Sequence, residues 1–255
     1  MKGDRVSSGI FGLDDLVAGG FPKNSIILLA GGPGTGKTTF SLQYLYKGIV
    51  DYGENAIYVS SEEDFNEINT SMSAFGMDFE KVSNEKKFSM ITFEGSTEIK
   101  ELISRIKNSA KQIKANRLVI DSFSSLELFA STYKSVINEL PLSALRLPSS
   151  VMVPTEAIVR KMLYKLISSL KQLGLTTILT SEFDGSTKYS RYGVAEFLVD
   201  GLIVLHYSSI GQKKFGNIEI KKLRKTKHTH GIFDYDLTEK GFEIFVEHGP
   251  SIIMK

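Results

Sequence analysis

The chain has 255 residues, of which 42% are hydrophobic and 24% are charged, and its formal net charge at pH 7 is +2. This length and composition suit one globular α/β domain over residues 1–255, and the lack of cysteine excludes disulfides, thiolate catalysis and cysteine-based zinc sites. The polar N-terminus and the lack of an apolar run of about 20 residues predict a cytoplasmic protein without a signal peptide or a membrane segment.

The first predicted elements lead into a glycine-rich loop. Residues 1–24 contain a short helix bounded by glycines, and we expect them to form a cap segment that feeds the first strand. The apolar run 26–30 predicts that buried strand, and residues 40–50 predict a helix. Between them lies the sequence GGPGTGKTT, residues 31–39. A glycine loop between a strand and a helix is the context that a phosphate-binding loop requires.

The loop has the residue types that bind a nucleoside triphosphate. Its glycines let several backbone N–H groups point into one concavity, and the helix N-terminus behind it favours negative charge. Lys37 would reach the β- and γ-phosphates, and the hydroxyl of Thr38 would ligate Mg²⁺. The residues that we expect to bind the nucleotide here are Gly34, Thr35, Gly36, Lys37, Thr38 and Thr39.

Two acidic residues follow the second predicted strand, at residues 56–60. Glu62 and Glu63 would lie at the carboxyl end of that strand, where open parallel sheets place their sites. A carboxylate near the γ-phosphate can activate the attacking water. One of the two could instead cap the helix that is predicted for residues 65–75.

A third acidic residue ends a later strand. Residues 88–93 predict a strand, residues 99–113 predict an amphipathic helix, and residues 117–120 predict another buried strand that ends in Asp121. An apolar strand that ends in aspartate, at this distance after a phosphate loop, is the Walker B pattern. We therefore expect Asp121 to hold Mg²⁺ close to Thr38.

The C-terminal half is less regular at first. The segment 130–155 contains three prolines and many apolar residues, and we interpret it as a loop or an insertion that precedes another helix. Later strands and a hairpin are predicted at residues 175–180, 197–206, 217–223 and 232–246. Strands that alternate with helices predict a mainly parallel sheet with helices on both faces, and the last strands would add an antiparallel part at one edge.

Seven motifs follow one another along nearly the whole chain. They are SGIFGLDDLVAGGFP, GGPGTGKTTF, YVSSEE, LVIDS, TSE, EFLVDGLIVL and KLRKTKH. In this order they resemble the KaiC-like ATPases of the RecA superfamily, in the single-domain form found in archaea. The resemblance implies a RecA-like P-loop domain that binds ATP with Mg²⁺ and hydrolyses it. It also implies that Glu62 orients and polarises the attacking water and that Glu63 supports it.

The basic stretch 222–228 has two interpretations. In a strand, the side chains of Lys222 and Arg224 would share one face and could grip one phosphate, or they could form a solvated edge that prevents aggregation. In the family, matching residues reach the ATP bound by the adjacent subunit, and we favour this role by resemblance. The matching residues are Lys222, Leu223, Arg224, Thr226 and His228. The resemblance thus implies a homo-oligomeric ring, expected to be a hexamer, with ATP at the subunit interfaces.

The chain departs from the family at one point that bears on its activity. The clock proteins of this family carry a Ser-Thr phosphorylation pair where this sequence has Glu196 and Phe197. We therefore do not carry autokinase activity over to these positions.

Three functions compete at this point. The first is a ring-forming ATPase that acts as a regulatory switch, with a protein partner. The second is a DNA-repair accessory ATPase that binds single-stranded DNA through cations beside aromatic rings, although a net charge of +2 argues against tight non-specific binding. The third, a non-catalytic scaffold, conflicts with the presence of Lys37, Glu62 and Asp121. The residues that support DNA binding are Lys188, Tyr189, Arg191 and Tyr192.

Overall fold

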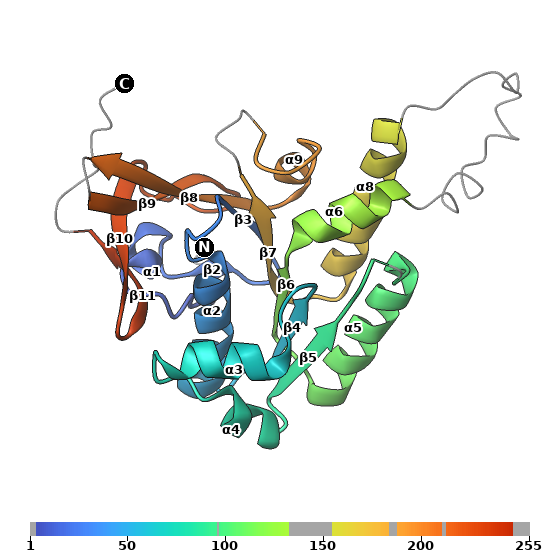
Figure 1. Cartoon of the computed structure of the whole chain (residues 1–255), viewed down its shortest axis with the longest axis horizontal. Helices are drawn as coiled ribbons and strands as arrows, with labels where there is room; N and C mark the ends of the chain where they lie inside the picture. The colour runs from blue at the N-terminus through green and yellow to red at the C-terminus, as the bar shows by residue number, and fades with distance from the viewer. Residues whose placement is uncertain (1–3, 96, 133–154, 184–187, 211–212, 247–255) are drawn as a thin grey trace, which may run out of the picture.

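The computed structural model describes residues 4–95, 97–132, 155–183, 188–210 and 213–246 (Figure 1). In these residues β1 (Arg5–Val6) and β2 (Phe21–Pro22) form a small antiparallel pair. The strands of the main sheet are, in order across it, β11 (Gly241–Phe245), β10 (Ile232–Thr238), β9 (Lys213–Leu223), β8 (Gly201–Ile210), β3 (Ile26–Gly31), β7 (Thr176–Glu182), β6 (Arg117–Asp121), β4 (Ala56–Ser60) and β5 (Phe88–Thr92).

The strands from β8 to β5 all run parallel, which confirms the predicted fold class. Every residue of β3 and β4 is buried, because helices cover both faces of a parallel sheet. The strands β9, β10 and β11 are antiparallel and extend the sheet beyond β8, as expected for the C-terminal part. The carboxyl ends of the parallel strands meet at one edge, where ligand sites form in such sheets.

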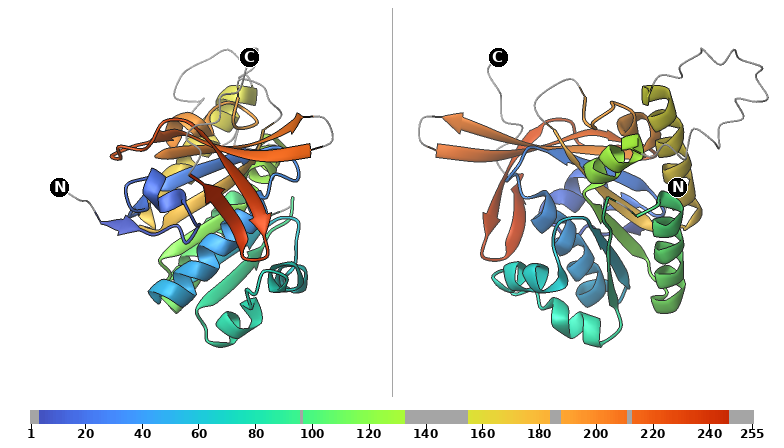
Figure 2. Two further views of the ribbon diagram at one scale, coloured as in Figure 1. Left: turned by 90° about the vertical axis from the view of Figure 1, so that its left-hand side faces the viewer. Right: turned by 45° about the vertical axis from the view of Figure 1, so that its right-hand side comes forward.

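Helices cover the sheet in two layers (Figures 1 and 2). The two layers follow from two buried apolar clusters, one on each face of the sheet. On one face lie α1 (Leu13–Leu16), α2 (Lys37–Tyr52), α3 (Phe65–Ser73) and α4 (Phe79–Asn84). On the other face lie α5 (Ile99–Ile113), α6 (Phe123–Thr132), α8 (Thr155–Gln172) and α9 (Ala195–Leu198).

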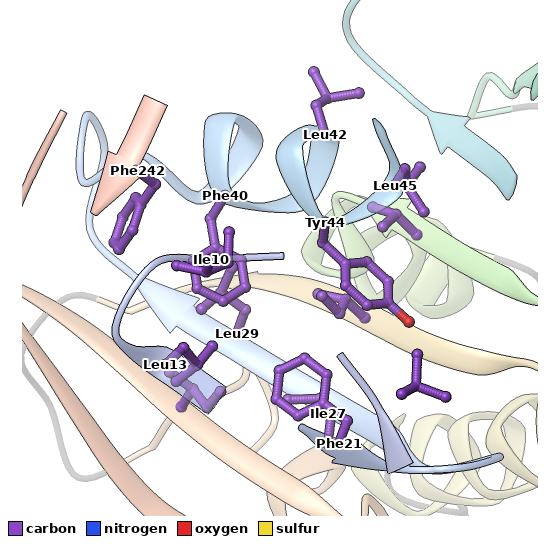
Figure 3. Close-up of a cluster of buried hydrophobic side chains, with 14 of the residues drawn as sticks. Ile10, Leu13, Phe21, Ile27, Leu29, Phe40, Leu42, Tyr44, Leu45 and Phe242 are labelled. Carbon is purple, nitrogen blue, oxygen red and sulfur yellow. The ribbon is translucent and has the colours of Figure 1, made fainter. Parts of the chain in front are cut away.

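The N-terminal segment braces the helix that follows the glycine loop. Leu13 and Phe21 pack in the same cluster as Phe40 of α2 and Phe242 of β11 (Figure 3). The side chain of Gln43 connects α2 to the N-terminal segment and to β11. Its amide nitrogen donates to the carbonyls of Gly9 and Phe242, and its amide oxygen accepts from the backbone N–H of Phe242 at 2.7 Å. The expected cap segment therefore packs against α2 and the last hairpin as well as against the first strand.

One strand of the C-terminal half differs from the prediction at its start. The strand expected at residues 197–206 begins only at Gly201, because α9 occupies the residues before it. Asp200 fixes this boundary: its carboxylate accepts from the backbone N–H of Ile26 at 3.0 Å, which aligns the start of β8 with the start of β3. The consecutive apolar residues 197–199 resemble the start of a buried strand, and a four-residue helix is too short to show its own period.

The segment predicted at residues 130–155 lies mostly outside the described residues. Its first three residues end α6, and its last residue begins α8. Within the described part of the chain, no helix is both long enough and apolar enough to cross a membrane.

Candidate nucleotide-binding site

The glycine loop joins β3 to α2 with two glycines in the left-handed region. Gly34 has a φ of 74° and Gly36 a φ of 84°, a conformation that side chains with a Cβ rarely adopt. The hydroxyl of Thr35 donates to the carbonyl of Gly32 at 2.8 Å and closes the turn. The sequence thus places its glycines where the loop turns and brings the N-terminus of α2 to the carboxyl edge of the sheet.

Lys37 lies within the curve of this loop. Its Nζ donates to the carbonyls of Gly31 and Gly32, each at 2.9 Å. Burial lowers the pKa of Lys37, and the carboxylates of Asp121, Glu182 and Glu62 oppose that shift. The ammonium group is therefore held against two carbonyls at the start of the loop, with three carboxylates close enough to favour its charged form.

Asp121 is the acceptor of three hydroxyl groups from three different elements. Thr38 of α2 donates to Oδ2 at 2.8 Å, Tyr58 of β4 donates to Oδ2 at 2.9 Å, and Thr180 of β7 donates to Oδ1 at 2.6 Å. Burial, the charge of Asp121 and the hydrogen bond to it raise the pKa of Tyr58 well above 10, so this hydroxyl remains a donor. The structure brings together the two residues expected to hold the metal, Thr38 and Asp121.

This donor set suits Mg²⁺. The ion is hard, prefers oxygen ligands, and is usually held by one or two protein groups together with water and substrate phosphates. A hydroxyl and a carboxylate at direct hydrogen-bond distance match that pattern. Across the described ranges, no three His, Cys, Asp or Glu side chains gather into a site that would bind a metal by themselves.

The two predicted carboxylates after β4 differ in their surroundings. The hydroxyl of Ser60 accepts from the backbone N–H groups of both Glu62 and Glu63, at 3.2 and 3.0 Å. Glu62 is exposed at the carboxyl edge, close enough to Lys37 for its charge to favour the ammonium form. Glu63 is half-buried: burial, Asp121 and Glu67 raise its pKa, and its Oε2 has no partner among the described residues. Asp64 caps α3 through its own side chain, so neither glutamate is needed for that role.

The last hairpin packs against the glycine loop, which sequence reasoning did not predict. Tyr235 of β10 donates its hydroxyl to the carbonyl of Thr35 at 2.7 Å, and its ring stacks on Phe242 with centroids 4.3 Å apart. Leu237 lies near Gly36, so that a Cβ at this glycine would be 3.4 Å from it. The alternating pattern predicts a hairpin but carries no information about which part of the sheet it meets.

The basic stretch lies at the opposite edge of the sheet. Gly201 pairs with both Leu223 and Ile27, so the end of β9 is level with the start of β3, whereas the glycine loop follows the end of β3. At about 3.3 Å per residue, these two edges are roughly 15 Å apart. The stretch therefore does not face the loop of its own chain.

One detail of the basic stretch was predicted wrongly. Lys222 and Arg224 do not share the face of a strand, because β9 ends at Leu223, where its partner β8 begins. Both side chains nevertheless reach α9: Lys222 donates to the carbonyls of Glu196 and Val199 at 3.0 and 2.7 Å, and Arg224 donates to that of Phe197 at 3.2 Å. Two cations thus bind carbonyls that the short helix leaves free.

The other predicted residues of this stretch have different partners. The side chain of Leu223 is buried, so only its backbone could contact a ligand. Thr226 accepts from the guanidinium of Arg5 at 2.6 Å. His228 contacts His230, with ring centroids 4.7 Å apart. The N-terminal segment therefore holds the turn that follows β9.

A cleft of about 510 Å³ opens beside Arg224 at this edge. Among the described residues, its wall includes several cations and two acidic residues. An arrangement of this kind favours an anionic ligand. The charged residues of the wall are Asp4, Arg5, Lys23, Lys171, Asp200, Arg224 and Lys225.

The loop that was considered for DNA binding is fixed by two acidic residues. Glu127 of α6 accepts from the backbone N–H of Arg191 at 3.0 Å, and Glu196 accepts from that of Tyr189 at 3.1 Å. Tyr189 also stacks on Phe183, with centroids 5.0 Å apart. Its ring is partly buried, and the face on Phe183 is not presented for base stacking.

Glu127 predicts a measurable dependence of stability on pH. Its side chain is fully buried, and burial raises its pKa from 4.5 to about 7, with Glu196 adding to the shift and the N–H of Arg191 opposing it. The unfolded chain ionises near 4.5, so the native state loses stability as the pH rises from 4.5 to 7, by about 3 kcal/mol in all.

We expect the variant Glu127→Gln to lack this loss. The free energy of unfolding can be measured with urea at pH 5 and at pH 8. The decrease from pH 5 to pH 8 should be about 2–3 kcal/mol smaller in this variant than in the wild type. Because the other titrating groups are the same in both proteins, their contributions to the pH dependence cancel in this comparison. An equal fall in both proteins would mean that Glu127 does not titrate as its burial implies.

The chain is similar in sequence to proteins of one family. The sequence profile described as "ATPase: KaiC" matches residues 6–143 and 148–249. The "Circadian clock oscillator protein KaiC" of Prochlorococcus marinus is 31% identical over 255 residues, and that of Synechococcus elongatus is 32% identical over 251 residues. The alignments cover 96% and 94% of this chain but 46% and 44% of those proteins. The chain thus spans about half the length of these curated relatives.

A solved structure resembles the whole fold. It is the crystal structure of a KaiC-like protein from the hyperthermophilic archaeon Pyrococcus horikoshii OT3, with 36% sequence identity and a TM-score of 0.78. The match covers 95% of this chain and 99% of that one. The described sheet and its helices therefore have the architecture of a KaiC-like protein.

Proposed function

Because this chain belongs to the KaiC family of ATPases, we propose that it binds ATP with Mg²⁺ at the glycine loop and hydrolyses it to ADP and phosphate. The observation that carries this proposal is the direct contact between Thr38 and Asp121, with Lys37 inside the same loop. A loop that served only as a turn would not need a hydroxyl, a carboxylate and an ammonium group in one place.

Each residue of the site has a role in this reaction. Thr38 would ligate Mg²⁺ directly and Asp121 through water, while Lys37 would bind the β- and γ-phosphates. The bound Mg²⁺ would neutralise charge on those phosphates. Glu62 is the exposed carboxylate at the carboxyl edge and would orient the attacking water and accept its proton, with Glu63 in support.

We propose that a second copy of the chain completes the site. Lys222 and Arg224 lie at the edge opposite their own glycine loop, so they could contact the phosphates only of a nucleotide bound to a neighbour. Their edge and the loop edge are different surfaces. A contact between them is heterologous, and repetition of such a contact gives a ring when the rotation between copies closes; we expect a closed hexamer here.

Such a ring would act as a regulatory switch: its conformation would change with the bound nucleotide, and a protein partner would recognise that conformation. The alternative, an accessory ATPase that binds single-stranded DNA, has less support. Tyr189 is partly buried and packs on Phe183, so one face of this aromatic ring of the proposed DNA loop is already occupied. Binding to single-stranded DNA that weakens steeply with salt and depends on Arg191 would favour the alternative.

The proposal predicts that assembly and hydrolysis both respond to Mg-ATP. Light scattering should detect a particle of about 170 kDa with Mg-ATP, six times the 28.3 kDa of one chain. Phosphate release, followed in the same sample, should stop when EDTA removes the metal. A monomer that hydrolyses ATP would contradict the shared site, and a particle without phosphate release would contradict the ATPase.

A further inference from the structure

Tyr58 is a buried side chain whose hydroxyl meets the proposed metal site. The residue is 1% exposed, and its hydroxyl donates to Oδ2 of Asp121 at 2.9 Å. We propose that Tyr58 is a positioning residue for Mg²⁺: its hydroxyl fixes the Asp121 carboxylate in the orientation that receives a metal-bound water. This inference rests on the proposed Mg²⁺ site and adds a residue to it.

The sheet brings Tyr58 to this position. Strand β4 lies beside β6, with Ser60 opposite Asp121 and Tyr58 opposite Val119. Positions two residues apart along a strand are separated by about 7 Å. The ring of Tyr58 extends over this distance, so that its hydroxyl lies level with the Asp121 carboxylate. The ring belongs to the buried cluster beneath α2, so it cannot swing away without disturbing the core.

The hydrogen bonds of Asp121 leave a defined acceptor position. A carboxylate has about four acceptor positions, two on each oxygen. Thr38 and Tyr58 occupy both on Oδ2, and Thr180 occupies one on Oδ1. The remaining position on Oδ1 is the one that a metal-bound water would use. Thr38 donates its hydrogen to Asp121, so its own lone pairs stay available for the metal.

Loss of the Tyr58 hydroxyl would loosen this arrangement. Oδ2 would regain an acceptor position, and the carboxylate could rotate or bind a water that competes with the metal-bound one. Groups that orient metal ligands typically change metal affinity by about 10- to 100-fold when they are removed. The simpler explanation is that the hydroxyl only satisfies its own need for a partner in the core, which would affect stability but not the metal.

The variant Tyr58→Phe separates the two explanations. Mg²⁺ is titrated into protein saturated with a non-hydrolysable ATP analogue and followed by calorimetry. We expect about tenfold weaker Mg²⁺ binding, at the lower end of the usual range because two donors to Asp121 remain. Affinity for the same analogue in EDTA should stay within about twofold of the wild type, since the phosphate-binding loop is untouched.

Tyr44→Phe is the matched control. Tyr44 is also fully buried, and its hydroxyl donates to the carbonyl of Thr176 at 3.0 Å, away from Asp121. It should lower the melting temperature about as much as Tyr58→Phe does, with unchanged Mg²⁺ affinity. A positioning role moves Mg²⁺ affinity in only one of the two variants, whereas a structural role moves it in neither.

The outcomes also distinguish this inference from the proposed function. If the wild type responds to Mg²⁺ and Tyr58→Phe responds identically, the positioning role of Tyr58 is overturned and the metal site stands. If the wild type binds the analogue without any response to Mg²⁺, the metal site fails, and the role of Tyr58 fails with it.

Discussion

The variant Arg224→Ala should lower ATP turnover by about 10³-fold or more, with ATP binding largely intact, if its guanidinium acts on a neighbour's nucleotide. Arg224 is half-exposed, and its described contacts, to the carbonyl of Phe197 and to Asp200, use only part of its five N–H donors. Those contacts are to α9 and to the residue before β8 in the same chain, so the variant should not weaken nucleotide binding at its own loop. Phosphate release and the affinity for a fluorescent ATP analogue test the two statements separately.

Arg105→Ala provides the matched control for Arg224→Ala. Arg105 is an exposed arginine of α5, on a helix that takes no part in the glycine loop or in the turn after β9. Its loss should leave turnover unchanged. The variant Arg224→Lys keeps the charge but not the forked donors, and it should recover only part of the rate. Wild-type turnover in Arg224→Ala would refute the role of this residue.

The variant Glu62→Gln should lower turnover by about 10²- to 10⁴-fold, because the amide cannot accept the proton of the attacking water. Glu62 lies outside the glycine loop, and its side chain makes no hydrogen bond or ion pair with the other described residues. Binding of Mg-ATP should therefore persist or tighten slightly. Single-turnover phosphate release separates this effect on chemistry from an effect on product release.

Glu63→Gln is the comparison for this second variant. Glu63 is half-buried beside Asp121 and Glu67, and its raised pKa marks a group that is costly to ionise. Removal of its charge should reduce turnover less than Glu62→Gln does and should not destabilise the fold. The roles of the two glutamates would have to be exchanged if Glu63→Gln abolished turnover and Glu62→Gln left it unchanged.

Much of this arrangement could be predicted from the sequence because its signals are local. The glycine loop and its flanking strand and helix follow one another within residues 26–52, and Asp121 directly ends an apolar strand. In a parallel sheet the carboxyl ends of the strands share one edge, so motifs that end strands must gather there. The class of the fold and the meeting of Thr38 with Asp121 follow from these two facts.

Other contacts of the site depend on the order of the strands in the sheet, which cannot be predicted from local sequence patterns. Tyr58 and Thr180 reach Asp121 because β6 lies between β4 and β7. Tyr235 reaches the glycine loop because the last hairpin packs against α2. Each looks like an ordinary core residue along its own strand. Burial of Glu127 was equally unpredictable, since no local pattern distinguishes it from an exposed helical glutamate.

The turn after β9 shows why local reasoning failed at one point. Alternation along 222–224 predicts a shared strand face, but a strand ends where its partner ends, and β8 begins at Gly201. The two cations still act on the same place because α9 lies beside them. To predict their contact with α9, one would have to know where this four-residue helix lies, and a helix this short has no periodic signal in the sequence.

A mixing experiment tests the shared site most directly. Lys37→Ala removes the phosphate-binding lysine but keeps Arg224, and Arg224→Ala keeps the loop but lacks the cation for its neighbour. Each alone should be nearly inactive. When equal amounts are mixed and allowed to assemble, about one interface in four should join an intact loop to an intact Arg224, and turnover should recover to about a quarter of the wild-type rate. Turnover that stays at the sum of the two separate variants would contradict a site built from two chains.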